Sequence, residues 1–90
     1  MKYRITAPCR GSNTFDVLPE KELSLSPEKM CSLLRSIGFA IKVESDVMAI
    51  GQKEGVEVAI YRRGKVIIKN VGEKKEAEAL ADRIFSKIRK

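Results

Sequence analysis

The sequence predicts an α+β domain with an antiparallel sheet of about five strands and two helices packed on one face. Short runs of alternating apolar and polar residues, joined by tight turns, favour consecutive antiparallel strands. Two other segments repeat apolar residues at helical spacing, the first near the middle of the chain and the second at its end. With 90 residues the chain has room for one core, so we expect a single domain over residues 1–90.

The first third of the chain predicts one strand and one helix. Residues 2–7 alternate and predict a strand that ends at Pro8. Residues 8–25 contain glycine, proline and serine without a sustained period, so we expect them to be largely loop, with a short strand around Phe15, Val17 and Leu18 as the alternative. A helix is expected over 27–37, because serine, proline and glutamate occupy its start and Gly38 follows its end.

The remainder of the chain predicts four strands and a second helix, which gives the order β-α-β-β-β-β-α. The strands are expected over residues 39–44, 47–51, 56–61 and 65–70. Gly64 suits the positive φ of the tight turn between the last two strands. The second helix begins at Glu73, with acidic residues near its start and basic residues near its end, as the helix dipole favours.

Composition argues against most enzyme classes. The chain has no histidine, and Cys9 and Cys31 are its only cysteines. Two thiols cannot supply the four ligands of a structural zinc site, and without histidine there is no Cys–His pair for nucleophilic catalysis. We therefore expect no enzymatic activity, no metal and no cofactor. The chain has few asparagine and glutamine residues and many ionisable ones, a composition that is typical of thermophile proteins.

The net charge of +6 suggests a polyanionic partner, and the surplus lies mainly in residues 53–90. A basic protein of this kind is also compatible with simple solubility. Residues 1–9 are too short and too polar for a secretory signal, and no apolar stretch is long enough for a membrane helix. We therefore expect a cytoplasmic protein.

Two helices can cover only one face of the sheet, which leaves an open face. Alternation assigns to the helix side Tyr3, Ile5, Phe39, Ile41, Val43, Val56, Val58, Ile60, Val66 and Ile68. It assigns to the open face Lys2, Arg4, Thr6, Lys42, Glu44, Glu57, Ala59, Tyr61, Lys65, Ile67 and Lys69.

The open face is the candidate site for nucleic acid. Phosphate contact is expected from its basic residues, which are Lys2, Arg4, Lys42, Lys65 and Lys69. Tyr61 and Ile67 are apolar and suited to stacking on bases or wedging between them. Two other interpretations explain the same pattern. The face is solvated and tolerates a few apolar residues, or it contacts a second copy of the chain or another protein.

The run VEVAIYRRGKVIIKNVGEKKEAEALADRIFSKI at 56–88, together with the element order, resembles one half-repeat of the TATA-box-binding protein core. A strand that ends in Tyr61 leads through Gly64-Lys65 into a second strand, and Gly72 precedes a long helix. The resemblance implies a concave sheet that enters a DNA minor groove, with Tyr61 as a wedge and with Ile67 and Lys69 facing the groove. Since the family uses two halves, it also implies a homodimer.

Several features depart from that family. Tyr61 stands where the family has phenylalanine, and the second wedge position falls near Val47, which is not aromatic. Lys69 replaces a groove-facing threonine, and Glu44 and Glu57 would face phosphate or bases. The double-stranded-RNA-binding order α-β-β-β-α is a rival fold, which begins with a helix and has one strand fewer between its two helices. We expect a small non-enzymatic module that binds DNA or RNA through the open face. The alternative is a protein-interaction or accessory subunit that uses the same face without nucleic acid.

Overall fold

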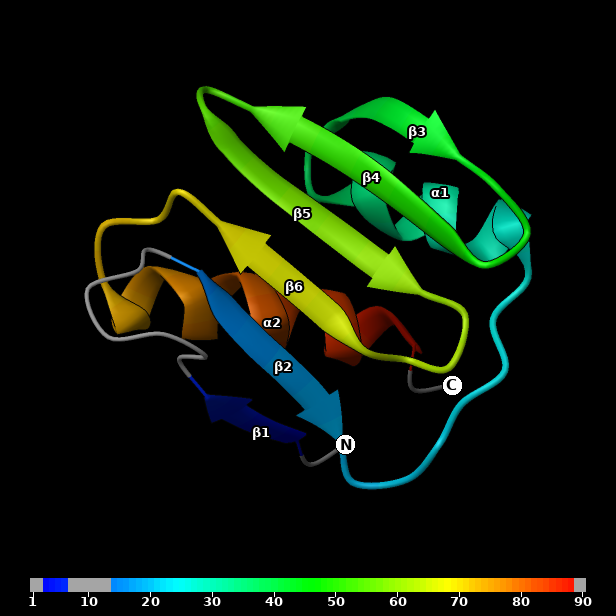
Figure 1. Cartoon of the computed structure of the whole chain (residues 1–90), viewed down its shortest axis with the longest axis horizontal. Helices are drawn as coiled ribbons and strands as arrows, with labels where there is room; N and C mark the ends of the chain where they lie inside the picture. The colour runs from blue at the N-terminus through cyan, green and yellow to red at the C-terminus, as the bar shows by residue number, and fades with distance from the viewer. Residues whose placement is uncertain (1–2, 7–13, 89–90) are drawn as a thin grey trace.

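The computed structural model describes residues 3–6 and 14–88 and shows one antiparallel sheet backed by two helices (Figure 1). The elements are β1 (Tyr3–Thr6), β2 (Phe15–Pro19), α1 (Pro27–Ser36), β3 (Ala40–Glu44), β4 (Met48–Lys53), β5 (Val56–Tyr61), β6 (Val66–Lys69) and α2 (Lys74–Ile88). The six strands lie in the order β1-β2-β6-β5-β4-β3. The α+β class is confirmed, with one strand more than expected. The predicted strand end at Pro8 lies outside the described residues.

The additional strand is β2, which falls within residues 8–25 that were expected to be largely loop. It pairs with β1 through Ile5 and Val17, and with β6 through Phe15 and Ile68. Val17 is fully buried. The segment alternates over only five residues and ends in proline, so its period is too short to separate it from the surrounding loop. The loop after β2 is fixed by backbone hydrogen bonds to the β5–β6 turn.

The two helices begin and end close to the expected residues. The Ser26 hydroxyl caps α1 by accepting from the Lys29 N–H at 3.1 Å, and Gly38 follows the helix at a φ of +87°. Before α2, the Gly72 N–H donates to the Glu76 carboxylate at 2.8 Å. In the described part of the chain, neither helix is long and apolar enough to cross a membrane.

One core fills the space between the helices and the sheet, and α1 lies close to β4 there. Ala49 is fully buried, and Gly51 lies directly under α1. A Cβ at Gly51 would lie 3.0 Å from Phe39 Cβ and 3.2 Å from Leu34 Cδ2, so a larger residue would push the helix away. Small residues on the inner side of β4 therefore permit this close packing.

A β-bulge in β3 reverses two of the predicted side-chain directions. Ile41 pairs with Gly51, but Val43 pairs with Ile50, so one extra residue lies between them. Val43, expected on the helix side, is 40% exposed on the open face. Glu44, expected on the open face, lies on the helix side. The extra residue shifts the two-residue alternation by one position, which exchanges the faces of the residues after it.

Candidate interaction face

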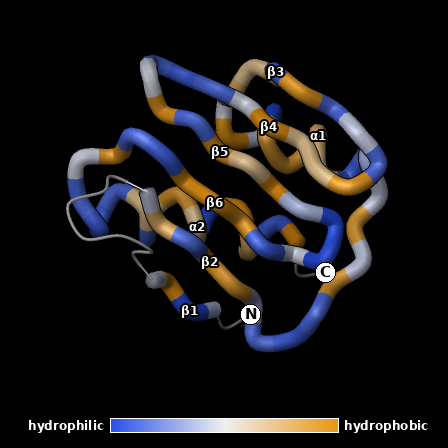
Figure 2. Tube along the Cα trace, viewed as in Figure 1, coloured by the Kyte–Doolittle hydropathy of each residue, from blue (hydrophilic) through white to orange (hydrophobic). Residues whose placement is uncertain are grey.

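The open face is the side of the sheet away from α1 and α2, turned toward the viewer in Figure 1. Four apolar residues form a row across its centre, from β3 to β6: Val43, Ile50, Ala59 and Ile67. Beside this row, Met48 of β4 pairs with Tyr61 of β5. Figure 2 shows that β6 is hydrophobic along most of its length, with residues of both faces of the sheet contributing. The centre of the open face is therefore more apolar than the sequence predicted.

Strand β4 accounts for most of this difference. Its large residues Met48 and Ile50 lie on the open face, whereas the small residues Ala49 and Gly51 face the core. Met48 and Ile50 were not predicted to lie on the open face, because residues 47–51 are apolar on both faces and show no alternation with polar residues. The available signal was the alternation of side-chain size.

A hollow of about 90 Å³ lies on the open face and is called here the hollow over Ala59. Its lining residues come from β4, β5 and β6 and are Met48, Ile50, Glu57, Ala59, Tyr61, Ile67 and Lys69. Ala59 is only 7% exposed because larger side chains surround it. Tyr61 is half-buried at the hollow and not enclosed in the core. The structure thus brings together Tyr61, Ile67 and Lys69 from the predicted site.

Two of the predicted phosphate-contacting lysines lie near carboxylates on the open face. Lys42 Nζ is 3.4 Å from a Glu57 carboxylate oxygen, and Lys65 Nζ is 3.9 Å from an Asp16 oxygen. Asp16 was not assigned to the open face because residues 8–25 were expected to be largely loop, without a defined strand register. Such exposed pairs are weak, but each carboxylate lowers the local positive potential that a phosphate would meet.

The other predicted cations are not gathered into one site. Among the described residues, neither Arg4 nor Lys69 has a carboxylate oxygen within 4.0 Å. Arg4 lies on β1 and Lys42 on β3, which are the two edges of the sheet. Five strand spacings of about 4.8 Å place these edges roughly 24 Å apart. Lys2 lies outside the described residues.

The positive charge of the chain is unevenly divided. All twelve acidic residues lie in the described part of the chain, whereas four of the eighteen basic residues lie outside it: Lys2, Arg10, Arg89 and Lys90. Fourteen basic residues against twelve acidic ones leave the described part at +2. Electrostatic attraction of a polyanion to this part of the molecule is correspondingly modest.

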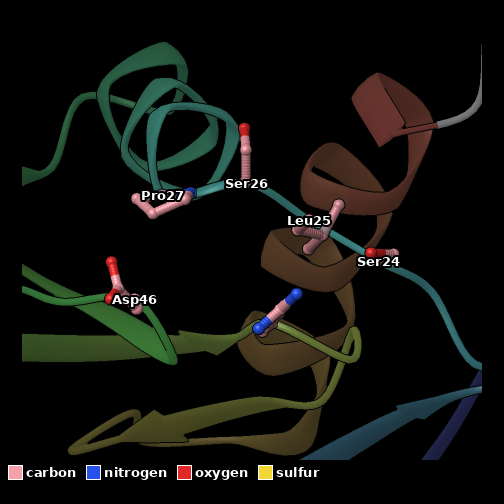
Figure 3. A pocket seen from close by; sticks show the side chains of 6 residues that line it. Ser24, Leu25, Ser26, Pro27 and Asp46 are labelled. Carbon is pink, nitrogen blue, oxygen red and sulfur yellow. The ribbon is translucent and has the colours of Figure 1, made fainter.

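A larger hollow, of about 430 Å³, lies away from the open face, at the start of α1 (Figure 3). The loop before α1, the β3–β4 turn and the β5–β6 turn form its walls, with Asp46 and Arg62 among the lining residues. The Ser26 hydroxyl there is already engaged in capping the helix. This hollow is the gap between three chain connections, and it presents charges of both signs.

Two titratable groups with shifted pKa values lie on the helix side. Burial, followed by the nearby Asp82 carboxylate, raises the pKa of Tyr3 to about 12. The Tyr3 hydroxyl donates to Asp82, and its ring stacks on Phe85 with centroids 5.1 Å apart. Burial and then the Glu44 carboxylate raise the pKa of the Cys31 thiol. Cys9 lies outside the described residues, and within residues 3–6 and 14–88 no group of three potential metal ligands occurs.

Comparison with protein-family models, with curated proteins and with solved structures finds no match to this chain. The resemblance to a half-repeat of the TATA-box-binding protein core therefore stays a prediction. The open face has an apolar centre that contains the hollow, and charged residues surround this centre.

Proposed function

We propose that this chain is a non-enzymatic interaction module that binds another protein through the apolar centre of the open face. The observation that carries the proposal is the direction of β4, whose large residues Met48 and Ile50 face outward while its small residues face the core. Outward apolar side chains add little to the stability of an isolated domain, and contiguous apolar patches mark interaction sites. Val43 and Ile67 extend the patch across four strands.

Nucleic acid is the second candidate, and one observation favours it. Tyr61 and Lys69 line the same hollow, so an aromatic ring and a cation lie together, as base stacking and phosphate contact require. The carboxylates near Lys42 and Lys65 and the low charge of the described residues support it less than they support a protein contact.

A peptide-display selection tests the protein-binding function. Immobilised wild-type chain is used for selection, and an Ile50→Ser/Ile67→Ser variant is used for counter-selection, after circular dichroism has shown that the variant folds. We expect peptides that bind the wild type with micromolar Kd and bind the variant at least tenfold more weakly. Failure to select any peptide that discriminates between the two chains would contradict the proposal.

Labelled duplex DNA, single-stranded DNA and RNA form the second arm of this test. Each is titrated at about 50 and 200 mM salt against the wild type and against Lys65→Glu/Lys69→Glu. Binding that weakens steeply with salt and is lost in the variant would favour nucleic acid instead, because released counterions produce that dependence. On the protein-binding proposal, we expect the two chains to bind nucleic acid equally weakly.

A further inference from the structure

We infer that the hollow over Ala59 receives a single aliphatic side chain from a carboxylate-rich segment of a partner protein. This inference rests on the proposed function and adds the chemistry of the partner. It follows from the shape of the hollow, from the charges beside it and from the poor fit of a second copy of this chain.

The shape of the hollow suits one apolar side chain. Ala59 is the smallest residue of its surroundings, and Ile50 and Ile67 flank it on the neighbouring strands. Met48 and Tyr61 form a second, adjacent pair on the same side. At about 90 Å³, the space is too small for an aromatic cofactor but matches an aliphatic side chain inserted between strands. Central apolar anchors of this kind commonly dominate binding energy.

The charges beside the hollow select the sign of the partner. Lys69 lines the hollow opposite Glu57 of β5, but among the described residues no carboxylate oxygen lies within 4.0 Å of its ammonium group. Two further lysines lie next to residues that line the hollow. Lys42 pairs with Glu57, and Lys65 accepts a backbone hydrogen bond from Tyr61. The described open face carries four basic residues and two acidic ones, so carboxylates on the partner would be complementary to it.

The same charges disfavour a second copy of the chain as the occupant. In a two-fold symmetric contact the same patch lies on both sides of the interface. Two open faces would therefore bring two surpluses of positive charge together, with Lys69 at the border of each apolar centre. Like charges across an interface are destabilising.

The inference is tested with three synthetic ten-residue peptides added to the ¹⁵N-labelled chain. The first has two leucines flanked by glutamates. The second has lysines in place of the glutamates, and the third has serines in place of the leucines. We expect the acidic leucine peptide to shift the amide signals of Ile50, Ala59 and Ile67 saturably, with millimolar Kd or tighter. The lysine peptide should bind at least fivefold more weakly, and the serine peptide should show no saturable shifts.

Matched variants locate the contact. Ala59→Met fills the hollow and should weaken the acidic leucine peptide at least tenfold, whereas Ala40→Met, at the edge of the same face, should change Kd less than twofold. Lys69→Glu should weaken binding at least fivefold. Lys53→Glu, which reverses a charge on β4 close to Gly38, is its control. Because Lys69→Glu leaves the hollow unfilled, it tests the inference even if Ala59→Met fails to fold.

Three outcomes would overturn the inference. If the acidic leucine peptide causes no shifts on the open face, no such side chain is received there. If the lysine peptide binds equally well with the same shifts, the chemistry of the partner is wrong, although the protein-binding function stands. If sedimentation shows a wild-type dimer that Ala59→Met converts to monomer, the occupant is a second copy. Failure of the display selection is a separate result, which contradicts the proposed function itself.

Discussion

The two faces of the sheet use the same kinds of residue for different purposes, and β6 shows this within two neighbouring positions. Ile68 is fully buried under the helices, whereas Ile67 is half-buried on the open face beside the hollow over Ala59. Burial of an isoleucine side chain under the helices contributes to folding, but the exposed part of Ile67 contributes only when something covers it. Apolar character therefore indicates stability on one face and recognition on the other.

The largest effect expected from this comparison is the loss of a core side chain. Ile68→Ala should lower the free energy of unfolding by about 2–5 kcal/mol, because it removes buried methyl groups and leaves a cavity. Ile67→Ala is the matched variant and should cost less than about 1.5 kcal/mol, since its side chain is already partly in water. Urea denaturation followed by circular dichroism measures both. Equal losses would show that the open face is part of the stabilising core.

The next effect tests whether the helix side extends to the edge strand β1. Tyr3→Phe removes the hydrogen bond to Asp82 and should cost about 1 kcal/mol at neutral pH. The Tyr3 pKa is about 12 in the folded chain against 10.0 in model compounds, so the unfolded chain ionises first as pH rises. The contribution of the neutral hydroxyl is fully present below pH 10 and is lost between pH 10 and 12.

Denaturation of the wild type and of Tyr3→Phe at pH 7, 10 and 11.5 measures this contribution. The difference between the two chains should shrink as pH rises, because the variant has no hydroxyl to titrate at that position. A difference that stays constant to pH 11.5 would show that the Tyr3 pKa is not raised in the folded chain.

A smaller gain in stability is expected at the β4–β5 turn, which fixes the register that places Met48 opposite Tyr61. Glu54 has a φ of +50° and precedes Gly55 at +86°, a geometry that favours asparagine followed by glycine. Glu54→Asn should raise the free energy of unfolding by about 0.5–1 kcal/mol by relieving left-handed strain. Thermal unfolding measures it, with Glu54→Gln as the control for lost charge. A gain shared by both variants would assign the effect to charge.

The smallest effect belongs to the ion pair between Lys42 and Glu57 on the open face. Its atoms are 3.4 Å apart and its side chains are 49% and 24% exposed. A double-mutant cycle with Lys42→Met and Glu57→Gln should give a coupling of about 0.5 kcal/mol or less, and less still at high salt. A coupling of several times that size would make this border of the open face a stabilising element.

Much of the fold could be predicted from the sequence, because local signals there agree with one another. The serine, proline and glutamate at the start of α1 specify a helix start whatever the tertiary structure. The apolar stripe of α2 and the alternation in β5 predicted both elements almost to their bounds. Tyr61, Ile67 and Lys69 were placed on one face because β5 and β6 alternate regularly.

The remainder depended on contacts that a local pattern does not encode. The bulge after Ile41 exchanges the directions of Val43 and Glu44, and nothing in the residues themselves marks the extra position. Residues 15–19 form a strand because their backbone pairs with β1 on one side and with β6 on the other. Ile50 points outward because α1 packs so closely on β4 that only a small residue such as Gly51 fits on the inner side. This closeness arises from tertiary packing and is not encoded in the local sequence.

The bulge in β3 has one more consequence, at the outer border of the sheet. A regular edge strand offers a ladder of unpaired amide and carbonyl groups on which further strands can assemble without limit. The irregular register between Ile41 and Val43 interrupts that ladder within a strand of only five residues. At this border the bulge therefore disfavours the addition of a strand from another molecule, although the neighbouring open face is apolar at its centre.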